Sequence, residues 1–250
     1  MRFDPKLIQQ LQTARRITAL TGAGISKESG IPTFREAQTG LWENYEATEL
    51  ATPQAFQRNP KLVWEWYQWR RSLVTQAEPN PAHMALVLME QRVPTFRLIT
   101  QNVDGLHQRA GSRNIIELHG NILRTKCFEH NHLVDHWQED GQIPPRCPVC
   151  GGQLRPDVVW FGENLPSSAI QRAAAAAQQT DIFLSIGTSG LVNPAASLPY
   201  MAIEAGALLV EVNPDHTPLT IYADYQLTSP AGEILPELVT QIWPSKGANS

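Results

Sequence analysis

Three cysteines and a histidine have the spacing of a metal-binding site. Two residues separate Cys147 from Cys150, and two residues separate Cys127 from His130. Three thiolates and one imidazole can bind zinc tetrahedrally, and a site filled entirely by protein ligands is structural rather than catalytic. Other side chains nearby could replace the histidine as fourth ligand: His132, Asp135 and His136. A metal-free loop or a redox pair of cysteines would give the same spacing.

A glycine turn and a polar loop could together bind a dinucleotide. Gly22 and Gly24 follow the apolar run Arg16–Thr21, and glycine lets the backbone approach a pyrophosphate closely. Asn102 and Asp104 follow a second apolar run and could hold an amide-bearing ring through donor and acceptor pairing. An ordinary strand-to-loop turn and an Asx turn are the alternatives. The third glycine and the acidic ribose partner typical of dehydrogenases are missing.

His119 is a candidate general base. It follows the apolar run Ile115–Leu118 and precedes Gly120, so it is placed at the end of a strand. An ordinary pKa of about 6.5 suits a proton acceptor at neutral pH. The alternative is a core histidine with satisfied hydrogen bonds.

Arg70 is a charge on an otherwise apolar broad face of the helix expected near residues 61–75. A buried guanidinium needs an anionic partner. Tyr67 lies one turn away on the same row, so the two side chains could clamp a carboxylate together. An internal salt bridge to an Asp or Glu of the protein is the alternative.

The hydrophobic pattern predicts how these residues are positioned. Apolar runs alternate with helical patterns, which indicates an α/β fold with a mostly parallel sheet. The expected strands are Arg16–Thr21, Arg97–Thr100, Asp181–Ile186, Ala207–Val212 and Tyr225–Leu227. The expected helices are Pro5–Ala14, Lys61–Thr75, Pro81–Gln91, Ser167–Gln179, Leu198–Ala205 and Glu233–Ile242. Small or polar residues follow each strand, at the edge where open α/β sheets bind ligands.

Composition excludes several classes of function. The 250 residues carry 20 basic and 24 acidic side chains, a net charge of −4 that argues against nucleic acid as a direct partner. No run approaches the roughly 18 apolar residues of a membrane span, and no apolar stretch near Met1 resembles a secretory signal. Three cysteines are too few for a disulfide framework, so we expect a cytoplasmic location.

Six motifs occur in an order and spacing that resembles a known family. They are Gly22-Ala23-Gly24-Ile25-Ser26, Gly30-Ile31-Pro32-x-Phe34-Arg35, Thr100-Gln101-Asn102-Val103-Asp104, His119-Gly120, Phe161-Gly162-Glu163 and Gly187-Thr188-Ser189. Together they resemble the sirtuins, which are NAD-dependent protein lysine deacylases, from about Arg15 to Val239. His130 stands where the family has its second zinc cysteine.

The resemblance implies one catalytic domain over residues 1–250. Its large part would be a Rossmann-like parallel sheet with helices on both faces, at about 1–35, 78–120 and 165–243. A small zinc-binding module would cover about 121–160, with a helical insert at about 40–76. We expect a monomer.

The resemblance also implies roles for individual residues. NAD would be bound by Gly22, Ala23, Gly24, Ser26, Phe34, Arg35, Gln101, Asn102, Asp104, Gly187, Thr188, Ser189, Asn213 and Ala231. His119 would be the catalytic base, assisted by Asn102 and Asp104. An acylated-lysine peptide would pair as an added strand with Val159, Trp160, Phe161 and Gly162. Zn²⁺ would be held by Cys127, His130, Cys147 and Cys150.

In the implied reaction the acyl group passes from lysine to ADP-ribose, giving free lysine, nicotinamide and O-acyl-ADP-ribose. Tyr67 and Arg70 resemble the signature of the class that removes acidic acyl groups, and Ala47 matches the small residue that widens its acyl pocket. We therefore expect removal of acetyl groups and preferential removal of succinyl or malonyl groups. The alternatives are protein mono-ADP-ribosylation at the same NAD site and a catalytically silent NAD- or peptide-binding module.

Overall fold

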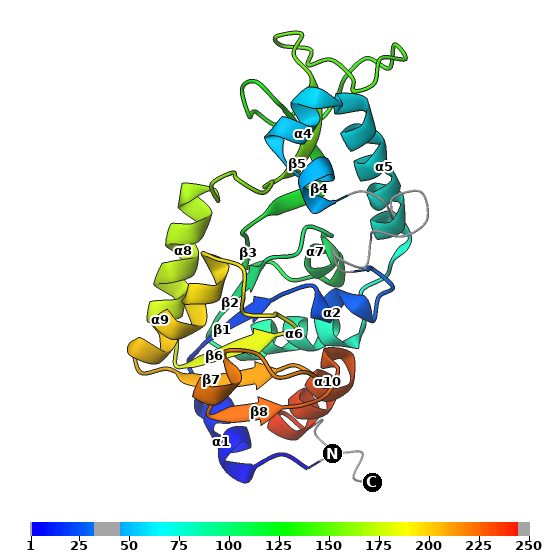
Figure 1. The fold of residues 1–250 in the computed structure, drawn as a ribbon. Helices are drawn as coiled ribbons and strands as arrows, with labels where there is room; N and C mark the ends of the chain where they lie inside the picture. The colour runs from blue at the N-terminus through cyan, green and yellow to red at the C-terminus, as the bar shows by residue number, and fades with distance from the viewer. Residues whose placement is uncertain (1, 33–45, 245–250) are drawn as a thin grey trace.

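A computed structural model describes residues 2–32 and 46–244, and in these segments a six-stranded sheet forms the centre of the molecule (Figure 1). The strand order is β3-β2-β1-β6-β7-β8, and every neighbouring pair is parallel. The bounds are β1 Arg16–Thr21, β2 Thr95–Thr100, β3 Ile115–Glu117, β6 Ile182–Ile186, β7 Leu208–Val212 and β8 Tyr225–Leu227. From β1 the strand order runs through β2 and β3 to one edge of the sheet, and β6, β7 and β8 continue from β1 to the other edge. The order therefore reverses between β1 and β6, which is the switch point of the sheet.

Helices cover both faces of this sheet. On one face pack α1 (Pro5–Thr13), α6 (Pro81–Arg92) and α10 (Ala231–Ile242), and on the other α8 (Ser167–Gln178) and α9 (Leu198–Glu204) (Figure 1). The buried row Ala169, Ala173 and Ala177 makes α8 a thin helix that lies close to the sheet. Asp4 and Asn80 cap α1 and α6, each before a proline at the first helical position.

A second, smaller unit joins a two-stranded antiparallel sheet to three helices (Figure 1). The strands are β4 (Gly120–Cys127) and β5 (Leu154–Val158), and the helices are α3 (Ala47–Leu50), α4 (Pro53–Arg58) and α5 (Pro60–Gln76). Phe56, Trp66 and Trp160 are buried between them. The pairing of β4 with β5 shifts register between Asn121 and Thr125.

Arg71 binds α5 to this irregular part of β4. Its Nε donates to the carbonyl of Ile122 at 2.6 Å, and its Nη2 donates to the carbonyl of Arg124 at 2.8 Å. These carbonyls lie where the ladder is disrupted, so the guanidinium replaces hydrogen bonds that the strand does not supply. The β4–β5 sheet and helix α5 are thereby held together.

The expected fold class is confirmed: the structure is an α/β Rossmann-like parallel sheet with helices, and its cysteine cluster could form a zinc-binding module. The predicted strands and helices occur with ends shifted by at most two residues. The strand expected before His119 is β3, and the short elements that were missed are α2 (Gly24–Lys27), α3, α4, α7 (Leu106–Ala110), β4 and β5. None of the described helices has the length and apolar character needed to cross a membrane.

Candidate active site

Two glycine loops meet where β1 and β6 end. The N–H of Gly24 donates to the carbonyl of Gly187 at 2.8 Å. A Cβ at Gly22 or Gly24 would come within 2.7 Å of Gly187, and one at Gly187, whose φ is +58°, within 2.6 Å of the Ile25 nitrogen. Glycine is therefore required here by the contact between the two loops. Ala23 lies in the same turn, directly before α2.

Ser26 joins the two polar residues that the sequence placed near NAD. The amide Nδ2 of Asn102 donates to the Gly22 carbonyl at 3.0 Å and to Ser26 Oγ at 3.1 Å. Ser26 Oγ donates in turn to Asp104 Oδ2 at 2.7 Å. The loop after β2 and the first turn after β1 thus form one hydrogen-bonded unit.

Asp104 is a buried carboxylate with a double role. Its Oδ1 accepts the backbone N–H of Leu106 at 2.9 Å, which is the Asx turn considered as an alternative in the sequence. Only 5% of the residue is exposed, and burial raises its pKa. The hydrogen bonds from Leu106 and Ser26 and the positive charges of Arg70 and Arg109 act against this rise.

His119 has the geometry of a neutral base. Its Nδ1 lies 2.9 Å from the carbonyl oxygen of Gln101, which can only accept, so Nδ1 carries the proton and Nε2 has the free lone pair. Burial lowers the pKa of the imidazole, and the hydrogen bond to Gln101 partly opposes this. Gln101 Nε2 also donates to Thr188 Oγ1 at 3.0 Å, which links the base to the loop after β6.

The remaining predicted NAD residues lie at the same edge of the sheet. Asn213, after β7, donates from Nδ2 to the Thr188 carbonyl at 2.9 Å. Ser189 is exposed, and Ala231 is the buried first residue of α10. Phe34 and Arg35 lie outside the described residues.

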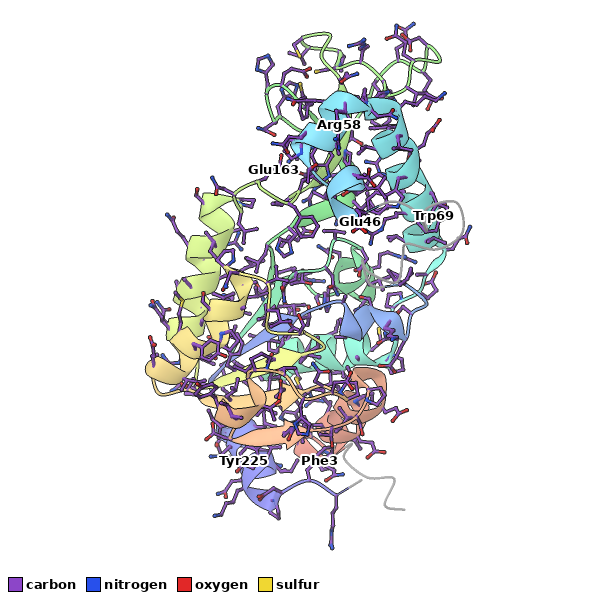
Figure 2. The ribbon with its side chains drawn as sticks, viewed as in Figure 1. Phe3, Glu46, Arg58, Trp69, Glu163 and Tyr225 are labelled. Carbon is purple, nitrogen blue, oxygen red and sulfur yellow. The ribbon has the colours of Figure 1, made fainter. Side chains whose placement is uncertain are left out.

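An ion pair fixes the segment predicted to bind the substrate peptide. Arg155, 1% exposed, pairs through both Nη atoms with Glu163. Glu163, labelled in Figure 2, follows β5 and precedes α8. Glu163 Oε2 accepts the N–H of Trp160 at 2.8 Å, and the Arg155 Cζ lies 3.3 Å from the centroid of the Trp160 ring. Sequence reasoning gave this pair no role.

The backbone of this segment is partly used within the protein. The N–H of Val159 donates to the His119 carbonyl at 2.9 Å, and that of Phe161 to the Ala51 carbonyl at 2.9 Å. The carbonyl of Val159 accepts no hydrogen bond from the described part of the chain. Gly162 lies beyond them in a turn with φ of +85°. The fold thus leaves one backbone acceptor of this segment, the Val159 carbonyl, available.

Tyr67 and Arg70 lie next to this segment. The Tyr67 hydroxyl accepts the indole N–H of Trp160 at 2.9 Å, and burial raises the pKa of Tyr67 to about 12, which keeps it protonated. The guanidinium of Arg70 lies 5.1 Å over the Trp66 ring; burial lowers its pKa, and its electrostatic interactions with Tyr67 and Asp104 act against this. Ala47 begins α3, and its side chain is outside the described part.

The cysteine cluster could hold a metal ion, and its candidate ligands form two groups that share Cys127: one with His132 and Cys147, the other with Glu129 and Cys150. Cys127 Sγ and Cys150 Sγ are 3.5 Å apart, and His132 Nε2 is 3.2 Å from Cys147 Sγ. Around zinc, with Zn–S of about 2.3 Å, ligand atoms are separated by roughly 3.5–3.8 Å. The ligand atoms of Cys127, His132 and Cys147 all lie within 4.8 Å of one another.

His130, predicted as the histidine ligand, is not in this group. It is exposed, and its ring stacks on that of His132 with centroids 6.4 Å apart. Asn131 has a φ of +55°, and the Cys127 N–H donates to the His132 carbonyl at 2.9 Å. This tight turn directs His132 toward the thiols, so His132, and not the predicted His130, lies beside Cys127 and Cys147 in the described residues.

Comparison with known proteins identifies the family. The sequence model of the Sir2 family matches residues 22–194. A relative from Aquifex aeolicus named "NAD-dependent protein deacylase" is 56% identical over 209 residues, which are 83% of this chain and 87% of that protein. The chain belongs to the Sir2 family.

Two solved structures agree with this assignment. A Sir2 homolog–NAD complex superposes with a TM-score of 0.89 at 47% identity, covering 96% of this chain and 94% of that one. A Sir2 protein bound to acetylated peptide has a TM-score of 0.84 at 31% identity, covering 94% and 97%.

Proposed function

We propose that the protein removes acidic acyl groups, succinyl or malonyl, from protein lysines, in addition to acetyl groups. Curated relatives of this Sir2-family chain in several species are named NAD-dependent protein deacylases, and the chain is an enzyme of that class. NAD is the co-substrate and supplies the ADP-ribose that receives the acyl group. Its binding residues are the glycine loops with Ser26, Gln101, Asn102, Asp104, Thr188 and Asn213. The macromolecular partner of this enzyme is a protein that carries acylated lysine.

His119 would act through its Nε2 atom. Because the Gln101 carbonyl holds the proton on Nδ1, Nε2 is free to accept a proton from a ribose hydroxyl. Asn102 and Asp104, tied together by Ser26, would orient the carboxamide of nicotinamide. The peptide would lie along Val159–Gly162, directly beyond the strand end that carries His119.

The observation that carries the acidic preference is the contact of Tyr67 with Trp160. The 2.9 Å hydrogen bond places the Tyr67 hydroxyl against the segment proposed for substrate, and Arg70 lies one turn further along α5. With its pKa raised to about 12, Tyr67 can donate its proton to a carboxylate, and Arg70 can supply the charge. The terminal carboxylate of a succinyl or malonyl group on lysine would bind both side chains.

The test compares kcat/KM for succinyl- and acetyl-lysine forms of one peptide. Arg70→Met should lower the succinyl-to-acetyl ratio about tenfold or more, because a charge-assisted pair contributes about 1.5–3 kcal/mol. Lys61→Met is the matched control, since it removes a cation from the exposed face of the same helix. A wild-type ratio in Arg70→Met would refute the acidic preference, and an ADP-ribose adduct on the peptide would refute deacylation.

We further propose a structural zinc ion bound by Cys127, Cys147, Cys150 and His132. With all positions filled by protein, the metal would hold the β4–β5 unit together and take no part in the chemistry. A reducing compartment would keep the thiols available for the metal, so we retain the cytoplasm as the proposed location.

A further inference from the structure

Two buried histidines are connected by hydrogen bonds to the loops of the proposed NAD site, and the mechanism above gives them no role. His83 on α6 is 0% exposed, and His107 on α7 is 1% exposed. Their ring centroids are 4.8 Å apart, with the planes tilted by 54°. Fully buried imidazoles are unusual in a core and call for an explanation.

The hydrogen bonds assign a neutral tautomer to each ring. His83 Nδ1 accepts the backbone N–H of Asn80 at 3.3 Å, so its proton is on Nε2. His107 Nε2 lies 2.9 Å from Thr21 Oγ1, and Thr21 donates its own proton to Thr100 Oγ1 at 2.9 Å. His107 therefore donates from Nε2. Burial lowers the pKa of His83 to about 4 and that of His107 to about 3, consistent with neutral rings.

The hydroxyl pair connects His107 to the loop that carries Asn102. Thr21 and Thr100 end β1 and β2, are partners in the sheet register and are both buried. Thr100 Oγ1 also accepts the backbone N–H of Asn102 at 3.0 Å. A continuous chain thus leads from the His107 imidazole through two hydroxyls to the backbone of Asn102, whose side chain binds Gly22 and Ser26.

A second set of hydrogen bonds connects His83 to the segment that follows β1. Asn80, which donates to His83, uses its Nδ2 to bind the Ile25 carbonyl at 2.7 Å and Ser29 Oγ at 3.0 Å. Ile25 lies in α2 beside Ser26. The loop after β1 and the loop after β2 are therefore both anchored on the histidine pair.

Stability alone does not explain these residues. The second nitrogen of each ring, His83 Nε2 and His107 Nδ1, makes no hydrogen bond within the described segments. Apolar side chains would fill the same space without these two unpaired ring nitrogens. The bonds that the rings do make all lead toward residues 21–29 and 100–102.

We propose that His107 is a positioning residue: its bond to Thr21 and Thr100 fixes the Asn102 backbone and so orients the Asn102 amide toward NAD. This inference rests on the proposed function, because it requires NAD to react at this site. The hydrogen bonds from His107 through Thr21 and Thr100 to the Asn102 N–H act as a unit. Removing any one of these side chains should therefore remove most of the effect on Asn102.

The experiment measures nicotinamide release, with kcat and the KM for NAD and for an acylated peptide, in Thr21→Val, Thr100→Val and His107→Leu. Each single variant should lose about tenfold in kcat/KM for NAD while the KM for peptide stays unchanged. The double variant Thr21→Val/His107→Leu should lose no more than either single variant. His107→Gln, which can place an N–H near the position of Nε2, and Thr100→Ser, which keeps the hydroxyl, should recover most of the rate.

Ser112→Ala is the matched control. Ser112 is buried just beyond α7, and its hydroxyl makes no hydrogen bond in the described segments. It is therefore not part of the hydrogen-bonded series from His107 to Asn102. Additive losses in the double variant, equal losses in Ser112→Ala, or no recovery in His107→Gln and Thr100→Ser would each overturn the positioning role. If the wild-type enzyme released no nicotinamide, the proposed function would fall and this inference with it.

Discussion

Nδ1 of His119 donates to the carbonyl oxygen of Gln101 across 2.9 Å, which leaves Nε2 as the basic atom. Burial lowers the pKa of His119 below its ordinary 6.5, so the neutral form persists below that pH. A base loses activity as the pH falls through its pKa. We therefore expect the acid limb of kcat/KM to lie below pH 6.5.

The measurement is a pH profile of kcat/KM with NAD and an acylated peptide. His119→Ala should lower the rate by about 10²–10⁴-fold, the usual contribution of a general base. An acid limb centred above pH 7, or a variant that keeps the wild-type rate, would show that His119 is not the base.

Glu163→Gln should disturb both stability and peptide binding. Burial alone would raise the pKa of Glu163, but its bonds to Arg155 outweigh this and lower it, which indicates a strong pair. Removing the carboxylate leaves the buried Arg155 charge unpaired, so we expect a loss of about 3–5 kcal/mol in the free energy of unfolding. The Trp160 N–H also loses its anionic acceptor, so the KM for peptide should rise more than the KM for NAD.

Urea denaturation and steady-state kinetics provide these values. The control is Glu65→Gln, which breaks the exposed pair of Glu65 with Lys61 and should change stability by at most about 1 kcal/mol. Equal destabilisation by the two substitutions would contradict the role assigned to the Arg155–Glu163 pair.

His132→Ala and His130→Ala should differ in metal binding. His132 Nε2 lies 3.2 Å from Cys147 Sγ, whereas His130 is exposed outside the ligand group. Removing a residue that hydrogen-bonds to a metal ligand lowers metal affinity by about 10–100-fold, so removing the ligand itself should lower the affinity at least as much. Zinc content and competition with a chelator measure this, with His130→Ala expected to match the wild type. Loss of zinc in His130→Ala alone would restore His130 as the ligand.

Acid should destabilise the protein through His83 and His107. Their pKa values of about 4 and about 3 in the folded protein lie below the ordinary 6.5, so between these limits the unfolded chain binds more protons. The free energy of unfolding should then fall as the pH drops below 6.5, by up to about 1.4 kcal/mol per pH unit for each ring.

Urea denaturation at several pH values measures this slope. His107→Leu should reduce the slope between pH 6 and 4, whereas His216→Leu, which removes an exposed imidazole, serves as the control. An unchanged slope in His107→Leu would mean that the ring is already protonated in the folded protein.

Much of the sheet was predictable because its strands are long apolar runs. The strand predicted at Arg16–Thr21 agrees fully, and that at Asp181–Ile186 agrees within one residue, since both are buried on two faces. Elements such as β5 and α7, each five residues long, show too little periodicity to be recognised. Packing against neighbouring elements decides their conformation.

The sequence by itself determined the order of the elements, the edge of the sheet at which the polar residues gather and the candidates for chemistry, because these follow from local periodicity and motif spacing. The tertiary structure decided which of two neighbouring histidines faces the thiols, which nitrogen of His119 is basic and which carboxylate neutralises Arg155. Those outcomes depend on atoms brought together from distant parts of the chain. Their separations are set by packing and by a single turn such as that at Asn131, which no spacing rule records.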